Sequence, residues 1–172
     1  YFLDEIVAKL LSIRKIKKEE VKFFLDPTIK NILPNPFILK DMNKAIERTI
    51  SAVLKKEKVG IFGDYDVDGA TSTAILGQYF KSLNIEYEIY IPDRKSEGFG
   101  PNEKAFSQFI NLGVNLIFTV DCGTLSFEPI KFAKEKKIDV IILDHHQSET
   151  KLPNAHSIVN PNRFDDRSEL NY

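Results

Sequence analysis

Three carboxylates at alternate positions are the clearest candidates for chemistry in this 172-residue sequence. Asp64, Asp66 and Asp68 lie between Gly63 and Gly69, directly after a short apolar run. Three negative charges so close together repel one another, and a bound cation is the simplest way to offset that repulsion. We interpret the stretch as one half of a metal site.

Further candidate ligands follow later apolar runs. Asp121 opens the sequence Asp-Cys-Gly-Thr, and Asp144, His145 and His146 are consecutive. Carboxylates with one or two imidazoles, and no cluster of cysteines, favour Mn²⁺ or Mg²⁺ over structural zinc. These groups are more numerous than one ion needs. The sequence therefore predicts a two-metal site with ions roughly 3.5–4 Å apart, an arrangement typical of phosphoester hydrolysis.

Two other residues are candidates for contact with a substrate phosphate. Arg94 follows another apolar run, although an ordinary surface role is equally open for it. Ser72 lies near the predicted start of a helix, where backbone N–H groups point toward an anion. Cys122 is better explained as a packed thiol than as a nucleophile, because no neighbouring base is implied. We interpret His156, isolated after a turn, as a loop residue.

Two simpler interpretations of the acidic stretch are less consistent with the sequence. A calcium-binding EF-hand loop also begins with Asp-x-Asp-x-Asp-Gly, but its twelfth residue should be a glutamate. Counting from Asp64, that residue is Ile75, and an apolar strand rather than a helix precedes the loop. A solvated acidic turn is the other interpretation. It does not explain why Asp121 and the residues 144–146 follow equivalent apolar runs.

The elements that must position these residues alternate between strands and helices from residue 58 onward. Apolar runs predict strands over 59–62, 86–91, 115–120 and 139–143, with a further candidate at 157–159; helices are predicted over 70–83, 102–112 and 126–136. This alternation predicts an α/β fold with a Rossmann-like parallel sheet flanked by helices. The carboxyl ends of parallel strands share one edge, where open α/β sheets bind ligands. We therefore expect the candidate residues to meet in one crevice.

Residues 1–57 are predicted to form a helical lead-in to a domain spanning residues 58–172. Apolar spacing predicts helices over 3–11 and 19–25, and a third with an apolar stripe from Met42 to Val53, for which Asp41 is the expected N-cap. In the helix over 70–83, the residues expected to face inward are Ala74, Ile75, Tyr79, Phe80 and Leu83.

Composition limits the function classes. The sequence is 42% hydrophobic and 28% charged, as in soluble globular proteins. A net charge of -1 excludes a histone-like binder but not a local basic patch for nucleic acid. One cysteine excludes an internal disulfide and suggests a reducing, cytoplasmic setting, and no apolar run has the length of a membrane span. Because the sequence begins with Tyr1 and ends in a polar segment, we expect a fragment.

The motifs resemble those of a known family. The run from Gly63 to Gly69, the residues 121–124 and the residues 144–146 resemble the first three motifs of the DHH phosphoesterase superfamily. The finer resemblance is to the bacterial RecJ exonucleases, and it rests on residues 91–100 and 152–163. This resemblance implies a 5′-to-3′ exonuclease specific for single-stranded DNA, dependent on Mn²⁺ or Mg²⁺ and acting in DNA repair and recombination. A single-strand-binding protein and a helicase are partners that the same resemblance implies.

The resemblance also implies roles for the metal ligands. Asp66 and Asp121 would hold one ion, and Asp68, Asp121 and His145 would hold the other, with Asp121 bridging the two. Asp64 would be a further ligand or would support the ligands.

Beyond the ligands, the resemblance implies that His146 contacts the scissile phosphate, that Asp144 orients the histidines and that Arg94 steers the DNA backbone. The family has a further metal-binding aspartate in a strand after the histidines, and nothing in this sequence supplies it. The family's two C-terminal domains, which grip single strands, are also absent from the sequence. We therefore expect the 172 residues alone to bind metal weakly and to have little or no activity.

Two alternatives remain open. Other DHH proteins cleave short oligonucleotides, cyclic dinucleotides or pyrophosphate, although the run from Glu97 to Gly100 favours the RecJ branch. The second alternative is a catalytically inactive fragment or a DNA-binding scaffold. A scaffold should have lost the metal ligands, whereas the three motifs are intact here.

Overall fold

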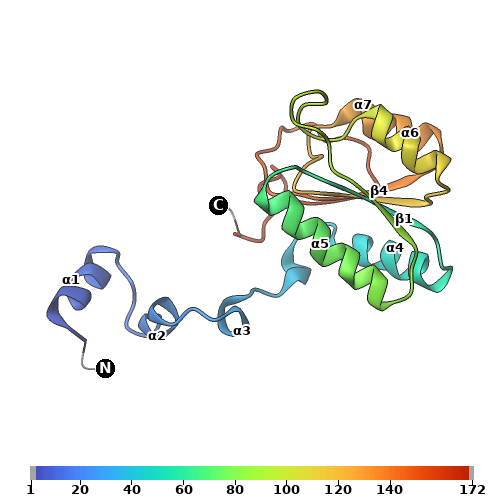
Figure 1. Cartoon of the computed structure of the whole chain (residues 1–172). Coiled ribbons are helices and arrows are strands. Elements are labelled where there is room, and N and C mark those ends of the chain that lie inside the picture. The colour runs from blue at the N-terminus through green and yellow to red at the C-terminus, as the bar shows by residue number, and fades with distance from the viewer. Residues whose placement is uncertain (1–2, 171–172) are drawn as a thin grey trace. The chain divides into compact units, whose positions relative to one another are not determined.

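The chain divides into two compact units, Tyr1–Asn35 and Pro36–Tyr172, in a computed structural model that describes residues 3–170 (Figure 1). The first unit contains three short helices, α1 (Glu5–Ile13), α2 (Val21–Leu25) and α3 (Ile29–Ile32). The Asp4 side chain caps α1 by accepting a hydrogen bond from the backbone N–H of Ile6 at 2.9 Å. The two helices expected before residue 26 are confirmed, although the second is confined to five residues.

The second unit is built on a five-stranded parallel sheet. Its strands are β1 (Val59–Gly63), β2 (Tyr87–Tyr90), β3 (Leu116–Val120), β4 (Asp139–Leu143) and β5 (Ser157–Val159). They lie in the order β2-β1-β3-β4-β5, and every neighbouring pair is parallel. This confirms the predicted fold class, and it confirms the candidate strand at 157–159.

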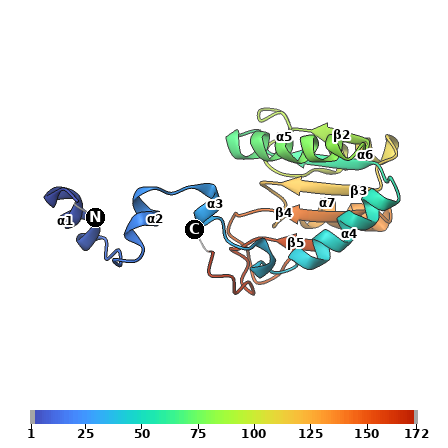
Figure 2. The same cartoon turned by 90° about the horizontal axis from the view of Figure 1, so that it is seen from below.

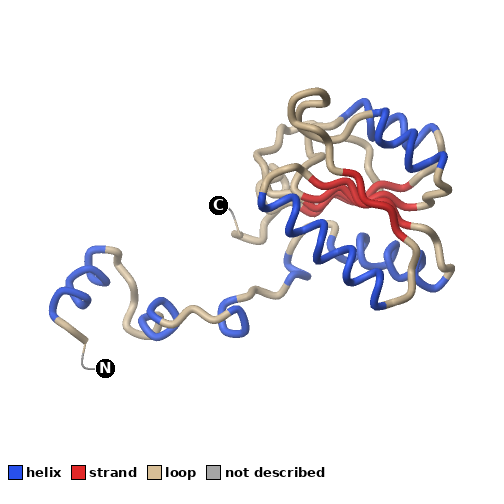
Figure 3. Tube along the Cα trace, viewed as in Figure 1, coloured by secondary structure: helices blue, strands red, loops and turns tan. Residues whose placement is uncertain are grey.

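Helices cover both faces of the sheet, as Figures 2 and 3 show. A short 3₁₀ turn, η1 (Pro36–Ile38), precedes α4 (Met42–Leu54). The helices α4 and α5 (Val67–Ser82) lie on one face of the sheet, and α6 (Glu103–Asn111) and α7 (Phe127–Glu135) lie on the other. Among residues 3–170, no helix is both long and apolar enough to cross a membrane.

The two faces of the central strand β3 pack into different hydrophobic clusters. Leu116, Phe118 and Val120 join the cluster that contains residues of α4 and α5, whereas Ile117 joins the cluster that contains residues of α6 and α7. Successive side chains of a strand point to opposite faces, so a strand buried on both faces reads as a continuous apolar run. This is why the strands β1, β3 and β4 could be found from the sequence.

The helix α5 begins three residues before its predicted start at Ala70. Oδ1 of Asp66 accepts hydrogen bonds from the backbone N–H groups of Asp68, at 2.9 Å, and Gly69, at 3.0 Å. Two N–H groups of the first turn are thereby satisfied, so the helix starts at Val67. The last residues of the acidic stretch therefore belong to the helix rather than to the loop before it.

The predicted inward face of α5 is wrong except at Phe80. Ile75 is 70% exposed and Tyr79 is 51% exposed, while Ala74 and Leu83 also face solvent. The prediction followed the apolar residues, but the residues of α5 that pack on the sheet are mostly small.

Close approach explains why α5 packs through small residues. Its buried positions, apart from Phe80, are Gly69, Thr73 and Gly77. A Cβ atom at Gly69 would lie 2.4 Å from the backbone oxygen of Asp64, and one at Gly63 would lie 1.9 Å from Oγ1 of Thr73. Larger side chains at these glycines would therefore push α5 away from β1 and from the start of the acidic stretch.

Asp41 occupies the N-cap position of α4, as predicted, but its side chain does not cap the helix. Within the described residues its carboxylate makes no bond to the first turn, and its backbone is left-handed, with φ of 62°. Instead, Oδ2 of Asp41 accepts hydrogen bonds from the backbone N–H of Ile158, at 3.1 Å, and from Nη1 of the buried Arg163, at 2.7 Å. The carboxylate therefore fastens the segment that follows β5 to the start of α4.

Candidate metal centre

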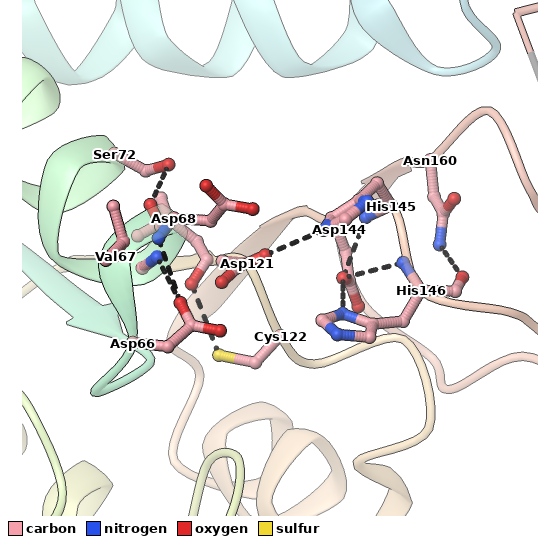
Figure 4. A network of polar contacts seen from close by, with 12 residues as sticks. Asp66, Val67, Asp68, Ser72, Asp121, Cys122, Asp144, His145, His146 and Asn160 are labelled. Atoms are coloured by element: carbon pink, nitrogen blue, oxygen red, sulfur yellow. Dashed lines mark hydrogen bonds and ion pairs between the residues drawn. The ribbon is translucent and has the colours of Figure 1, made fainter. Parts of the chain in front are cut away.

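Acidic and imidazole side chains from three loops meet at the carboxyl edge of the sheet (Figure 4). Ligand atoms of Asp64, Asp66 and Asp121 lie within 4.8 Å of one another. A second set of atoms with the same spacing comes from Asp121, His145 and His146. Asp121 is common to both sets, so the loop after β3 links the loop after β1 to the loop after β4.

The backbone turns sharply at Asp121, directly after β3. Its φ of 62° is left-handed, which is uncommon for a residue other than glycine and costs of order 1–3 kcal/mol. The backbone N–H of Asp121 donates to the carbonyl oxygen of Leu143 at 2.9 Å, so the turn is held by the end of β4. The residue is 5% exposed, and its side-chain Oδ1 lies 3.0 Å from Nε2 of His145.

Two buried carboxylate oxygens suggest that the centre is built for a cation. Among the residues that the structure describes, Oδ1 of Asp64 and Oδ2 of Asp121 are buried without a hydrogen-bond partner. Burying a charged oxygen in this way is costly unless an ion or a donor compensates. A hard divalent cation such as Mn²⁺ or Mg²⁺ would provide that compensation, so the residues present fit the predicted metal.

The two carboxyls at the middle of the centre differ in their affinity for protons. Burial, followed by the adjacent Asp66 carboxylate, raises the pKa of Asp121 to about 6. The pKa of Asp66 lies below its ordinary value, chiefly because its carboxylate accepts the backbone N–H of Gly69. Without a cation, the site therefore retains a proton on Asp121 well above the pH at which an ordinary aspartic acid would lose it.

The Asp144 carboxylate is buried and organises the two histidines. Its Oδ2 accepts two hydrogen bonds from Thr124, one from the backbone N–H at 3.0 Å and one from the side-chain hydroxyl at 2.6 Å. Its Oδ1 accepts from the backbone N–H groups of His145, at 2.8 Å, and His146, at 3.1 Å. Burial opposes the charge, but these bonds outweigh burial and hold the pKa of Asp144 below its ordinary value.

The same carboxylate fixes the His146 ring. Nδ1 of His146 lies 2.8 Å from Oδ1 of Asp144. Because an ionised carboxylate only accepts, the proton belongs on Nδ1, which leaves Nε2 for other contacts. Burial lowers the pKa of His146, but the bond to Asp144 outweighs burial and raises it overall.

The remaining predicted site residues lie around this centre. Asp68 is in the first turn of α5 and joins neither set of ligand atoms found among residues 3–170. Asp68 and Ser72 nevertheless line the same cavity of about 470 Å³ as Asp121 and His145. The Ser72 hydroxyl donates to the backbone oxygen of Asp68 at 2.6 Å.

Arg94 lies on the exposed loop that follows β2. Its guanidinium carbon is 5.3 Å from the centroid of the Tyr65 ring, so it sits beside the acidic stretch. Phe99, on the same loop, has its ring centroid 5.5 Å from that of His146. Phe99 belongs to the run from Glu97 to Gly100, but no local pattern predicts its contact with His146, because that contact joins the loops after β2 and β4.

Two residues that the sequence analysis set apart from the chemistry also lie outside the centre. Cys122 is buried, and burial raises the pKa of its thiol, which confirms a packed thiol rather than a nucleophile. His156 precedes β5, and its Nδ1 lies 3.7 Å from Oδ1 of Asp139, at the opposite end of β4 from the centre.

Comparison with known proteins identifies the family. Residues 58–170 match the profile of the DHH family, N-terminal domain. The chain belongs to the DHH family. It is 43% identical over 160 residues to the single-stranded-DNA-specific exonuclease RecJ of Bacillus subtilis strain 168, and 39% identical over 139 residues to that of Haemophilus influenzae. The resemblance to RecJ exonucleases is thereby confirmed.

Solved structures give the same relationship. A crystal structure of exonuclease RecJ bound to manganese has a TM-score of 0.68 and 29% identity, over 75% of this chain and 33% of that one. RecJ of Thermus thermophilus in complex with Mn²⁺ has a TM-score of 0.66 and 26% identity, over 83% of this chain and 20% of that one. The chain spans only part of the RecJ proteins that it matches. The match covers 92% of this chain and 20% of the Bacillus subtilis protein, and 80% of this chain and 24% of the Haemophilus influenzae protein.

Proposed function

We propose that this chain carries the metal-binding catalytic part of a nuclease that degrades single-stranded DNA from the 5′ end. The observation that supports this most strongly is the pair of buried, unpartnered oxygens, on Asp64 and Asp121, found among the described residues at the edge where the candidate ligands gather. An acidic centre of this kind suits a cation that acts on a phosphodiester. The names of its relatives supply the substrate, single-stranded DNA.

The proposed centre holds two ions, Mn²⁺ or Mg²⁺. Asp66 and Asp121, with Asp64 beside them, would hold one ion; Asp121 and His145, with Asp68, would hold the other. The membership of Asp121 in both sets of ligand atoms supports its role as the bridging ligand. When bound, the ions would supply activation of water and neutralisation of charge on the phosphoryl group.

The other residues would bind and orient the substrate. His146 would contact the scissile phosphate through Nε2, since its Nδ1 is held by Asp144 at 2.8 Å. Asp144 would keep both histidines in place. Arg94 would bind a phosphate of the strand as it enters, and Ser72, in the cavity beside the ligands, would contact the phosphate near the start of α5.

The test has two parts, one for the chain and one for the whole protein. Binding of Mn²⁺ to the 172 residues is measured by electron paramagnetic resonance, with Asp121→Asn expected to lose it. Release of nucleotides from 5′-phosphorylated single-stranded DNA is measured for the whole protein. Degradation of cyclic dinucleotides or dinucleotides in preference to long single strands would contradict the proposal, as would unchanged activity of Asp121→Asn.

The proposal extends to the setting of the protein. Residues 58–172 would form the phosphoesterase domain, which the family profile beginning at residue 58 supports. Residues 1–57 would form a helical lead-in whose last helix, α4, packs on the sheet within the compact unit Pro36–Tyr172. We further propose that the whole protein acts in DNA repair and recombination in the cytoplasm, with a single-strand-binding protein and a helicase as partners. Co-purification of these partners with the whole protein on single-stranded DNA would test it.

A further inference from the structure

The segment after β5 contains a fully buried amide that bears on the candidate metal centre. Asn160 directly follows β5, and its side chain is 0% exposed. Its Nδ2 lies 2.9 Å from Oγ1 of Thr124 and 2.9 Å from the backbone oxygen of His146, while its Oδ1 accepts the backbone N–H of Asn162 at 2.8 Å. One carboxamide therefore joins the loops that follow β3, β4 and β5, and Figure 4 shows its bond to His146 in the loop after β4.

The direction of each hydrogen bond in this network is fixed by chemistry. An amide NH₂ only donates, and an ionised carboxylate only accepts. Asn160 must therefore donate to the Thr124 hydroxyl, and that hydroxyl must donate its own hydrogen to Oδ2 of Asp144, at 2.6 Å. The opposite carboxylate oxygen, Oδ1, holds Nδ1 of His146. A continuous chain of hydrogen bonds thus runs from Asn160 to the imidazole.

A second asparagine supports the same histidines from the same segment. Nδ2 of Asn162 donates to the backbone oxygen of His145, and Nδ2 of Asn160 donates to that of His146. Both carbonyls of the histidine pair are therefore held by amides that belong to the segment after β5. Because that segment is itself fastened to Asp41 through Arg163, it has little freedom to move away from the histidines.

We propose that Asn160 is a positioning residue that sets the orientation and tautomer of His146 through Thr124 and Asp144. The proposal rests on the proposed metal centre for its functional meaning. Asn160 belongs to neither set of ligand atoms, so its effect is exerted through the hydrogen bonds it donates. Partners of this kind, one step behind the ligands, typically change metal affinity or activity by about 10–100-fold when removed.

Three isosteric or conservative variants of the 172-residue chain separate this role from a structural one. Asn160→Asp replaces the donor with an acceptor of the same shape. Thr124→Val removes the hydroxyl and keeps the volume, while Thr124→Ser keeps the hydroxyl. As a control for loss of stability alone, Arg48→Met breaks ion pairs of 2.6 Å to Glu57 and Asp139, at the opposite end of the sheet.

Two measurements are made on each variant. Nitrogen NMR shifts of the His146 ring, recorded on metal-free protein above the pKa of the ring, report the tautomer. We expect the wild type and Thr124→Ser to carry the proton on Nδ1, and Asn160→Asp and Thr124→Val to lose that preference. Electron paramagnetic resonance reports the Kd for Mn²⁺. Because Asp144 also holds the backbone N–H of the proposed ligand His145, at 2.8 Å, the Kd should rise about 10–100-fold in the same two variants and stay unchanged in Arg48→Met.

The outcomes separate this proposal from the proposed function. A folded Asn160→Asp that keeps the wild-type tautomer would overturn the positioning role, and Thr124→Val gives the same test if Asn160→Asp does not fold. A comparable rise in Kd for Arg48→Met would also overturn it, since general destabilisation would then account for the effect. If the wild type bound no Mn²⁺, the proposed metal centre would fail, while the tautomer measurement would still decide the role of Asn160.

Discussion

Replacing Asp121 with asparagine should stabilise the metal-free protein and at the same time abolish its stabilisation by Mn²⁺. The folded protein holds the Asp121 pKa at about 6, compared with an ordinary value of 3.8, because of burial and the neighbouring Asp66 carboxylate. Ionised Asp121 is therefore unfavourable in the folded state unless a cation is present. An asparagine has the shape of the protonated acid and carries no charge.

The sign and size of the effect follow from that pKa. A carboxyl whose pKa is raised on folding contributes stability below about pH 4, and this contribution is lost as the pH rises through about 6. The difference between the two pKa values corresponds to about 3 kcal/mol at most. For a protein of this size, that is a gain in Tm of up to roughly 6–12 °C for Asp121→Asn at about pH 7.5, falling to about zero at about pH 4.

Thermal unfolding with and without Mn²⁺ provides the assay. At a Mn²⁺ concentration about 100 times its Kd, the wild type should gain about 2.7 kcal/mol, and Asp121→Asn should gain nothing. Asp139→Asn is the matched control, because Asp139 pairs with Arg48 at 2.6 Å at the far end of β4. It should lower the Tm and leave the gain from Mn²⁺ unchanged.

Three results would refute this reasoning about Asp121. A metal-free Asp121→Asn protein that is less stable than the wild type at neutral pH would show that the buried charge is compensated by the protein itself. A Tm gain from Mn²⁺ equal to that of the wild type would show that the ion binds elsewhere. A pH-independent difference between the two proteins would likewise contradict the assignment of the raised pKa to Asp121.

Three further experiments test other features. Gly69→Ala should lower the free energy of unfolding, measured by chemical denaturation, by at least about 1–3 kcal/mol, because the new Cβ would lie 2.4 Å from the Asp64 backbone. Gly77→Ala should change it by less than about 1 kcal/mol, because the nearest contact of its new Cβ is a ring atom of Tyr87 at 3.2 Å. Cys122 should react with a thiol reagent only as fast as the protein unfolds, so fast labelling of the native protein would contradict its burial. In the whole protein, Arg94→Ala should weaken binding of single-stranded DNA and reduce the slope of the logarithm of the binding constant against the logarithm of the salt concentration by about one charge. Arg94→Lys should keep the wild-type slope. Equal slopes in the wild type and both variants would contradict a phosphate contact.

The strands β1, β3 and β4 could be predicted because they are buried on both faces. Residues 59–62, 115–120 and 139–143 are apolar almost without interruption, so their type and place required no knowledge of their neighbours. The order of the strands could not be predicted from such runs, because pairing depends on contacts between distant segments. The sheet order β2-β1-β3-β4-β5 is information that only the structure supplies.

The helix α5 shows where the sequence pattern misleads. Its apolar residues, such as Ile75 and Tyr79, face solvent, and its glycines and Thr73 face the sheet. A pattern of hydrophobic residues measures the tendency to be buried, whereas close packing on β1 requires small side chains. The start of α5 was misjudged for a related reason, since Asp66 was regarded only as a ligand and not as a cap.

The candidate site was predictable to the extent that strand ends reveal it. Asp64, Asp121 and His145 follow three strands, and the parallel arrangement alone brings them to one edge. The same rule would have identified Asn160, which follows β5, but amides were not considered as candidates. The partners of Asp144 could not be foreseen, because a residue's hydrogen bonds depend on side-chain positions that no spacing rule specifies.

The ion pair between Asp41 and Arg163 can form only after residue 163 has been synthesised. The two residues are 122 positions apart, and the bond from the Ile158 backbone to the same carboxylate spans 117 positions. Contacts between such distant segments form late, because the intervening chain must first be ordered. Residues 157–163 must therefore emerge from the ribosome before β5 can join the sheet and before this segment can hold the loop of His145 and His146. We expect the nascent chain to acquire its affinity for metal only at that point.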